Sequence, residues 1–205
     1  MSPHLLLAFL ATFFFVSITP GMCMTLSMTL GMTIGVRRTL WMMAGELLGV
    51  ALVAVAAVIG VATVMLNYPL AFTLVKYLGG AYLIYLGIQM WRAKGKLAMK
   101  LDASETQASR QQLAMQGLVT AIANPKGWAF MVSLLPPFID ASKPMAGQLS
   151  MLVGIIMCTE FSCLLLYASG GKSLGRFLGS GNNLRLLNRI AGSLMMGVGI
   201  WLAVS

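Results

Sequence analysis

The sequence predicts an all-α membrane protein of six transmembrane helices in two inverted three-helix repeats, with the first and fourth helices interrupted at proline. Three observations predict this fold class: a very apolar composition, six long apolar runs, and two prolines at corresponding places in the two halves. Of the 205 residues, 59% are hydrophobic and only 9% are charged, and the mean hydropathy is +0.86. A soluble domain carries about 25% charged residues, so the composition excludes an ordinary soluble protein.

The six apolar runs are each long enough to cross the hydrocarbon core of a bilayer, which needs about 20 helical residues. They cover residues 5–34, 40–66, 68–91, 113–135, 145–167 and 184–204. Residues 1–4 form no basic n-region and a second apolar run follows almost at once, so we expect the first helix to remain rather than to be a cleaved signal peptide. Because Cys23, Cys158 and Cys163 all fall within apolar runs, no disulfide framework is suggested.

The net charge of +9 comes from basic residues that gather on one side of the predicted membrane. They fall in the first, third and fifth connections between helices: Arg37, Arg38, Arg92, Lys94, Lys96, Lys100, Arg110, Lys172, Arg176, Arg185 and Arg189. The only basic residue in the connections on the opposite side is Lys143. By the positive-inside rule, the basic connections are cytoplasmic and both termini are periplasmic. The charge therefore reflects membrane topology, and the expected surroundings are membrane lipid, not nucleic acid.

One long polar segment, the cytoplasmic linker 93–112, separates the first three helices (residues 1–92) from the last three (residues 113–205). Each half crosses the membrane an odd number of times. If the second half repeats the first, the two halves are therefore inverted relative to each other, as in many secondary transporters.

Two matches between the halves support such a repeat. Thr19-Pro20-Gly21 in the first helix is followed 105 residues later by Asn124-Pro125-Lys126 in the fourth. In the third and sixth helices, the same spacing separates Gly80 from Gly87 and Gly192 from Gly199.

The two prolines predict that each interrupted helix is a pair of half-helices. Proline removes a backbone hydrogen bond inside a helix but fits the first position of a new one. Since Thr19 and Asn124 are both good N-caps, we expect the second half-helices to begin at Pro20 and Pro125. In inverted halves, the two new N-termini would face each other near the middle of the bilayer and could bind a substrate carboxylate. A simple proline kink without a ligand is the alternative.

Four ionisable residues lie inside the predicted helices: Glu46, Lys76, Lys126 and Glu160. Each costs about 2.5–3.5 kcal/mol or more at mid-helix, so each is a candidate functional residue. Counted from the ends of their helices, both glutamates reach a depth similar to that of the prolines. A carboxyl group withdrawn from water can exchange a proton near neutral pH, and its ionised form accepts hydrogen bonds from an amine. The alternative is that the glutamates only form structural salt bridges with Lys76 or Lys126.

A resemblance to a known family rests on Thr19-Pro20-Gly21, Gly31, Gly35, the run YLGGAYLIYLG at 77–87, Asn124-Pro125-Lys126 and Leu135-Pro136-Pro137-Phe138. The chain resembles the LysE/RhtB amino-acid exporters in these motifs, in the order of the motifs and in the length of the chain. The resemblance implies a bacterial inner-membrane carrier with two inverted halves that exports amino acids or close derivatives, driven by the proton motive force. The family's first motif usually continues with a second proline and then Asp or Asn. Met22 and Cys23 stand there instead, which favours an apolar substrate such as leucine or methionine.

We therefore predict a secondary active transporter, not an enzyme, that exchanges an amino acid for protons. The predicted substrate and proton site consists of Thr19, Pro20, Gly21, Glu46, Asn124, Pro125, Lys126 and Glu160. Either glutamate could carry the proton, and neither a metal nor another cofactor is expected. Carriers of this size often pair, so a homodimer is an alternative to a monomer. Two other classes remain: a membrane thiol-electron carrier that uses Cys23, and a carrier of inorganic ions.

Overall fold

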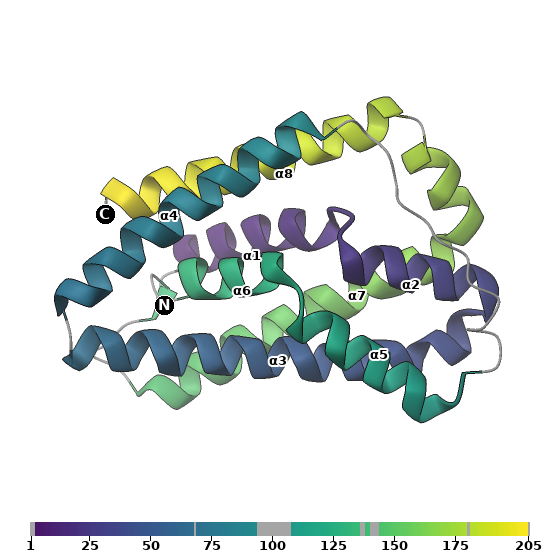
Figure 1. Ribbon diagram of the computed structural model, residues 1–205, viewed down its shortest axis with the longest axis horizontal. Helices are drawn as coiled ribbons and strands as arrows, with labels where there is room; N and C mark the ends of the chain where they lie inside the picture. Colours follow the sequence, from purple (N-terminus) through teal and green to yellow (C-terminus); the bar gives the residue numbers. More distant parts are fainter. Residues whose placement is uncertain are drawn as a thin grey trace.

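The computed structural model describes residues 3–67, 69–93, 108–135, 138–139, 144–179 and 181–204, and this part of the chain is all-helical. Its helices are α1 (Pro3–Ile18), α2 (Met22–Thr33), α3 (Val36–Asn67), α4 (Pro69–Arg92), α5 (Arg110–Ile122), α6 (Pro125–Leu134), α7 (Met145–Gly179) and α8 (Gly181–Val204). They form one elongated bundle with both chain ends at the same end of it (Figure 1). We call this the terminal end, and the opposite end, where α3 and α5 begin, the linker end. Most of the predicted linker lies outside the described residues.

The described helices include segments that are long and apolar enough to cross a membrane. Two are single helices, Val36–Gly60 within α3 and Met145–Gly171 within α7. A third consists of Phe9–Ile18 and Met22–Thr33, which are bent by 53° relative to each other. The predicted all-α class is confirmed, and the first predicted helix is a broken one.

The break between α1 and α2 lies at the predicted proline but is built differently from the prediction. α2 begins at Met22 rather than at Pro20, and its N-cap is Gly21 in an extended conformation. The prediction that Thr19 caps the second half-helix is wrong, because its hydroxyl donates a 2.6 Å hydrogen bond back to the Phe15 carbonyl. A threonine in the last turn of a helix can reach the carbonyl four residues earlier, and proline has no N–H with which to continue that helix. Thr19 therefore closes α1.

The break between α5 and α6 agrees with the prediction. α6 begins at Pro125, and its N-cap is Asn124, whose side-chain oxygen accepts a 3.1 Å hydrogen bond from the Lys126 backbone N–H. α5 begins with a capping box made by Ser109 and Gln112. The fourth predicted helix is thus two short helices, each with its own N-terminal cap.

The fifth predicted helix is longer than expected. The sequence predicts its end at residue 167, but α7 continues to Gly179. Gly171 has φ 35° and ψ −117° inside it, a conformation that only glycine adopts readily. The last turns of α7 therefore point in a different direction from the rest of the helix.

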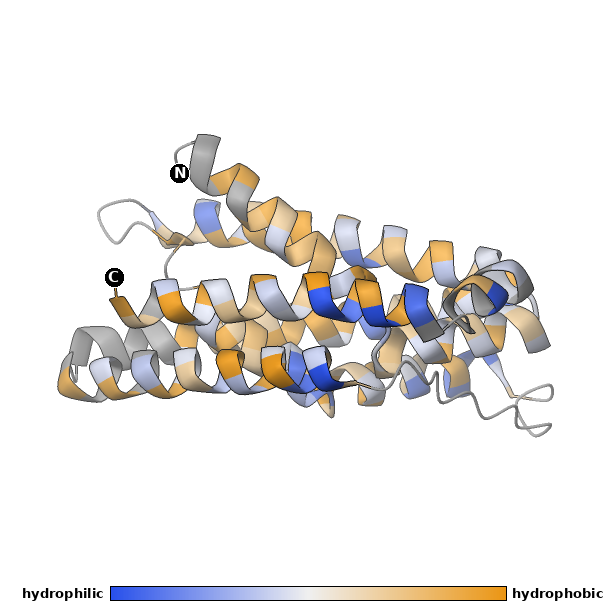
Figure 2. Ribbon diagram, turned by 90° about the horizontal axis from the view of Figure 1, so that it is seen from above, coloured by the Kyte–Doolittle hydropathy of each residue, from blue (hydrophilic) through white to orange (hydrophobic). Residues whose placement is uncertain are grey.

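α4 and α8 are antiparallel and lie side by side along their lengths (Figures 1 and 2). A Cβ atom on Gly87 would lie 2.6 Å from the Gly192 carbonyl oxygen, and one on Gly199 would lie 2.6 Å from that of Gly80. Only glycine permits this approach of two backbones. Within the described residues, the α4–α8 pair rests against α1, α3, α6 and α7 but has at most weak contact with α2 and α5.

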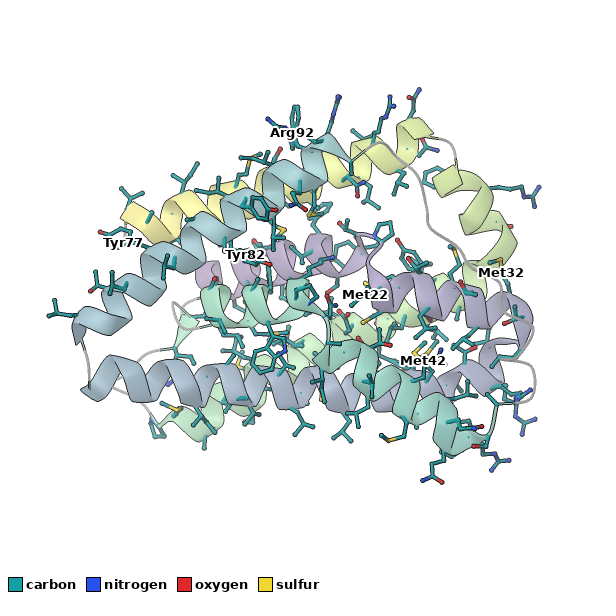
Figure 3. All side chains as sticks on the ribbon, viewed as in Figure 1. Met22, Met32, Met42, Tyr77, Tyr82 and Arg92 are labelled. Carbon is teal, nitrogen blue, oxygen red and sulfur yellow. The ribbon has the colours of Figure 1, made fainter. Side chains whose placement is uncertain are left out.

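The buried side chains form two apolar clusters. The cluster toward the terminal end is rich in phenyl rings and includes Phe9, Phe13, Phe130 and Phe138. The cluster toward the linker end is rich in methionine and includes Met24, Met28, Met42 and Met43. Apolar residues also occur along the outer faces of the helices (Figure 2), and Tyr77 and Tyr82 of α4 are exposed (Figure 3), as expected for a surface in contact with lipid.

Candidate functional site

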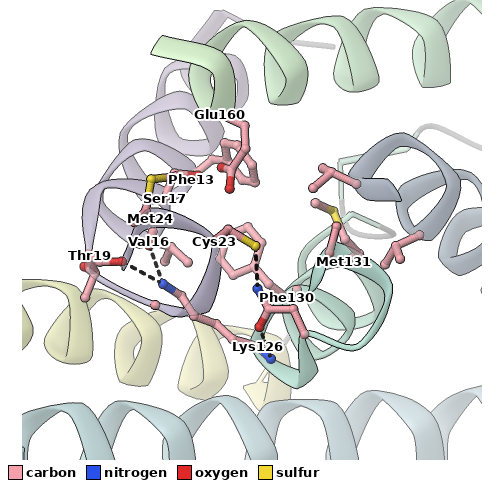
Figure 4. A pocket seen from close by; sticks show the side chains of 16 residues that line it. Phe13, Val16, Ser17, Thr19, Cys23, Met24, Lys126, Phe130, Met131 and Glu160 are labelled. Atoms are coloured by element: carbon pink, nitrogen blue, oxygen red, sulfur yellow. Dashed lines mark hydrogen bonds between the residues drawn. The ribbon is translucent and has the colours of Figure 1, made fainter. Parts of the chain in front are cut away.

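Side chains join the α1–α2 helix break to the α5–α6 helix break. The Lys126 ammonium group, in the first turn of α6, donates hydrogen bonds to the carbonyls of Val16 (2.7 Å) and Thr19 (3.2 Å) at the end of α1. The Asn124 amide nitrogen lies 3.7 Å from the sulfur of Cys23 at the start of α2. Figure 4 shows these contacts around a shared cavity. The two breaks therefore make one structural unit, although they are about a hundred residues apart in sequence.

The end of α1 is stabilised by side chains of other helices. A helix leaves its last four carbonyls without partners inside the helix, and a bilayer offers no water to satisfy them. The Tyr167 hydroxyl of α7 donates a 2.7 Å hydrogen bond to the Ile18 carbonyl, next to the two carbonyls bound by Lys126. Protein groups thus satisfy these carbonyls at the end of α1.

The start of α2 has no comparable partner among the side chains that the structure describes. No side chain caps it at Gly21, whereas Asn124 caps α6. The first turn of a helix presents free N–H groups and a partial positive charge. The Lys126 ammonium nitrogen lies only 3.8 Å from where a Cβ atom on Gly21 would be. An uncapped helix start and a cationic side chain therefore border the same space.

A cavity of about 50 Å³ lies between the two breaks (Figure 4). It is lined by Phe13, Val16, Ser17, Thr19, Gly21, Cys23, Met24, Val50, Val53, Ala121, Asn124, Lys126, Gly127, Phe130, Met131 and Glu160. One part of this lining is polar and charged, and another consists of aromatic and aliphatic side chains. A volume of this size has room for a few water molecules. Its walls must therefore move apart before a whole amino acid can enter.

The two buried glutamates belong to this region. Glu160 of α7 lines the cavity and lies near the Ser17 hydroxyl and the Lys126 ammonium group. Glu46 of α3 is 0% exposed, and in the described part of the chain neither carboxyl oxygen has a hydrogen-bond partner with good geometry. It lies close to the Cys23 thiol and to the Glu160 carboxyl group. A buried polar group without a partner is rare and suggests a functional role.

The structure brings most of the predicted site residues together. Those that line the cavity are Thr19, Gly21, Asn124, Lys126 and Glu160. Pro20 and Pro125 shape the breaks without lining the cavity, and Glu46 reaches the site through its contact with Cys23.

The alternative of structural salt bridges is only partly consistent with these contacts. Lys126 and Glu160 attract each other electrostatically, but the hydrogen bonds given for the Lys126 ammonium group go to backbone carbonyls. The side chain of Lys76 lies outside the described part of the structure.

Sequence reasoning missed the residues one to two turns away from the breaks. Phe13 and Ser17 precede the first break, and Phe130 and Met131 follow the second, and all four line the cavity. Residues three and four apart share a helix face, so counting by that spacing from Lys126 finds Phe130. The same count from Val16 finds Phe13, but only once the helices are known to break where they do.

A bundle of apolar helices in which two broken helices surround a cavity with buried charges is typical of membrane transporters. The family model described as LysE type translocator matches residues 14–205, and the chain belongs to this family. The resemblance to LysE-type exporters is thereby confirmed. The family consists of translocators, so the match does not indicate a catalytic activity.

Several relatives match nearly the full length of the chain. An uncharacterized membrane protein of Vibrio cholerae is 33% identical over 206 residues, covering 100% of this chain and 99% of its own. A homoserine/homoserine lactone efflux protein of Salmonella typhimurium is 31% identical, covering 96% of this chain and 94% of its own. A leucine efflux protein of Salmonella choleraesuis is 28% identical, covering 92% and 90%. No solved structure gives a significant match.

Proposed function

We propose that the chain is a secondary active transporter that exports an amino acid or a close derivative in exchange for protons. The observation that carries the proposal is the cavity between the two helix breaks, which is lined by the Lys126 ammonium group and the Glu160 carboxyl group, with the Glu46 carboxyl group beside Glu160. The relatives support an amino acid as the exported molecule, because two of them are described as efflux proteins for leucine and for homoserine and its lactone.

In this proposal the helices make six membrane spans, with α1–α2 and α5–α6 as the two broken spans. Residues 1–92 and 113–205 are then inverted repeats joined by the linker 93–112. The glycine contacts support this arrangement. Gly80 and Gly87 correspond to Gly192 and Gly199 in the repeat, and Gly80 packs against Gly199 while Gly87 packs against Gly192. Such reciprocal contacts are what a twofold axis between two equivalent halves produces.

The linker end of the bundle faces the cytoplasm in this proposal. The basic residues whose side chains the structure describes lie at the starts of α3 and α5, at the end of α4, in the last turns of α7 and in the first half of α8: Arg37, Arg38, Arg92, Arg110, Arg176, Arg185 and Arg189. By the positive-inside rule, both termini are then periplasmic in the bacterial inner membrane.

The substrate carboxylate binds between Lys126 and the start of α2. This helix start is uncapped at Gly21, and the ammonium group beside it adds a full positive charge. Thr19 and Pro20 hold the first break open, while Asn124 and Pro125 fix the second. A carboxylate is a stronger acceptor for an ammonium group than a carbonyl is, so it can compete for Lys126.

Glu160 and Glu46 have different roles in this proposal: one binds the substrate amine, and the other carries the proton. Glu160 lines the cavity, so it accepts hydrogen bonds from the substrate amine. Glu46 lies outside the lining but beside Glu160, so it carries the proton that is exchanged for substrate. Two neighbouring buried carboxyl groups can share one proton. The substrate amine and the proton compete for the two carboxyl groups, so occupancy by one excludes the other. This competition couples export of the amino acid to entry of the proton.

The test is uptake of labelled amino acids, including homoserine, into inside-out vesicles with and without an imposed pH gradient. We expect Glu46→Gln to lower gradient-driven uptake by at least about tenfold, which corresponds to 1.4 kcal/mol, and to leave passive exchange. Glu160→Gln should weaken substrate binding as well. Glu105→Gln, the same change in the linker, is the matched control.

Full gradient-driven uptake by both single variants would defeat the assignment of the glutamates. Uptake of no amino acid by correctly inserted protein would defeat the proposed function itself. Inorganic ions, and then the thiol-carrier alternative through Cys23→Ser, would be tested next.

A further inference from the structure

A column of aromatic rings runs from the cavity toward the terminal end of the bundle. Phe130 and Phe13, which line the cavity, have ring centroids 5.5 Å apart. The contacts continue from Phe13 to Phe9 at 5.8 Å and from Phe9 to Phe138 at 5.1 Å. The column ends at Trp201 of α8, 6.2 Å from Phe138. All four phenylalanines are at most 6% exposed, so the column closes the cavity on this side.

The rings fill a space between two helices whose backbones stay apart. Phe9 and Phe13 belong to α1, and Phe130 belongs to α6. Within the described residues, α1 and α6 make at most weak backbone contact, unlike α4 and α8, which touch through glycines. What separates the cavity from the terminal end is therefore side chains, and little backbone contact opposes a separation of α1 from α6.

Lys126 holds the same two helices together at the cavity. Among the described residues, the hydrogen bonds that join α6 to α1 are the two from the Lys126 ammonium group to the Val16 and Thr19 carbonyls. Beyond them the contact continues through aromatic rings, which attract each other without directional hydrogen bonds. If Lys126 binds another group, the contacts that the described residues keep between the two helices are apolar.

We propose that the aromatic column is the outer gate of the transporter and that Lys126 is the latch that a substrate carboxylate releases. This proposal rests on the proposed function and on the proposed orientation. A carboxylate in the cavity takes the Lys126 ammonium group from the α1 carbonyls, because an ionised acceptor makes the stronger hydrogen bond. α1 and α6 then separate, and the rings of Phe13 and Phe130 open the path to the periplasm.

The native thiol of Cys23 reports whether the gate is closed, because it lies in the cavity lining. In protein with Cys158→Ser and Cys163→Ser, we would measure its reaction with a membrane-impermeant cationic methanethiosulfonate added from the periplasmic side. Reaction of the unfolded protein gives the upper limit. We expect Phe13→Ala and Phe130→Ala each to raise the rate by at least about tenfold, since thiol reactivity follows access. Phe13→Leu is a milder variant in case the alanine protein does not fold.

Phe14→Ala is the matched control, because Phe14 is the next residue of α1 and is 43% exposed on the outside of the bundle. It should leave the rate unchanged. Equal rates for Phe14→Ala, Phe13→Ala and Phe13→Leu in folded protein would overturn the gate. This measurement needs no transported substrate, so it can succeed where amino-acid uptake fails and fail where uptake succeeds.

The latch is tested with acetate and acetamide, which have similar shape but differ in charge. At constant pH, we expect acetate to speed labelling of Cys23 and acetamide not to. Lys126→Met should raise the basal rate and remove the effect of acetate. Equal effects of the two molecules, or an acetate effect that persists in Lys126→Met, would show that Lys126 is not the latch.

Discussion

At the scale of the residue, two polar side chains in equivalent positions act in opposite directions. Asn124 bonds forward to the N–H of Lys126 and caps α6, whereas Thr19 bonds backward to the Phe15 carbonyl and closes α1. Both precede a proline, and both are good caps by type. The consequence is that one half-helix start is occupied and the other is open.

The hydroxyl of Tyr167 provides a test of how the break in α1 is stabilised. It donates to the Ile18 carbonyl from a side chain that is 1% exposed. Tyr167→Phe should lower the free energy of unfolding by about 1–3 kcal/mol, because a buried carbonyl is left without its partner. Tyr82→Phe, at a 39% exposed position on α4, should have little effect. Thermal unfolding in detergent measures both, and equal midpoints would contradict this account.

At the scale of the element, most of the helices could be predicted from hydropathy, and their interruptions from two prolines. Apolar length is enough to place a helix in a membrane, because the backbone must satisfy its own hydrogen bonds there. The residue at which α2 begins could not be predicted, since it depends on whether Thr19 bonds to the turn before it or the turn after it. The contact between Lys126 and the end of α1 could not be predicted either, because it joins segments that only tertiary packing brings together.

The pairing of α4 with α8 predicts that an alanine substitution lowers the stability of the protein strongly at one glycine of α8 and hardly at all at another glycine nearby. A Cβ atom on Gly199 would lie 2.6 Å from the Gly80 carbonyl oxygen, whereas one on Gly197 has open space. We expect Gly199→Ala to destabilise the protein by about 1–3 kcal/mol through overpacking. Gly197→Ala should be neutral or slightly stabilising, since alanine favours helix. Thermal unfolding of the two variants, which differ only in position along α8, checks the pairing directly, and equal destabilisation of both would exclude it.

At the scale of the whole molecule, both chain ends lie at one end of the bundle (Figure 1). This is required of a chain that crosses a membrane an even number of times, and the basic residues determine which side that end faces. The six crossings and the periplasmic side of the termini are predicted from hydropathy and charge alone, and both stay predictions.

The proposed topology predicts the behaviour of fusions at the C-terminus. Alkaline phosphatase fused after Ser205 should be active, because it folds in the periplasm. A fluorescent protein that matures only in the cytoplasm should be dark at the same position. The opposite pair of results would reverse the orientation. A fusion within the basic linker 93–112 should behave in the opposite way and serves as the control.

The α4–α8 pair touches α1 and α6 but has at most weak contact with α2 and α5, so the described helices do not obey the symmetry suggested by their glycines. When two inverted halves are equivalent, an asymmetric conformation has a second conformation of nearly equal energy, in which each half takes the conformation of the other. In that second conformation the α4–α8 pair would rest on α2 and α5. The cavity would then be closed at the linker end instead of the terminal end. Under the proposed inverted repeat, the unequal contacts of α4 and α8 belong to one of the two conformations of an alternating-access cycle, and the same contacts, transferred to the other half of the chain, give the second.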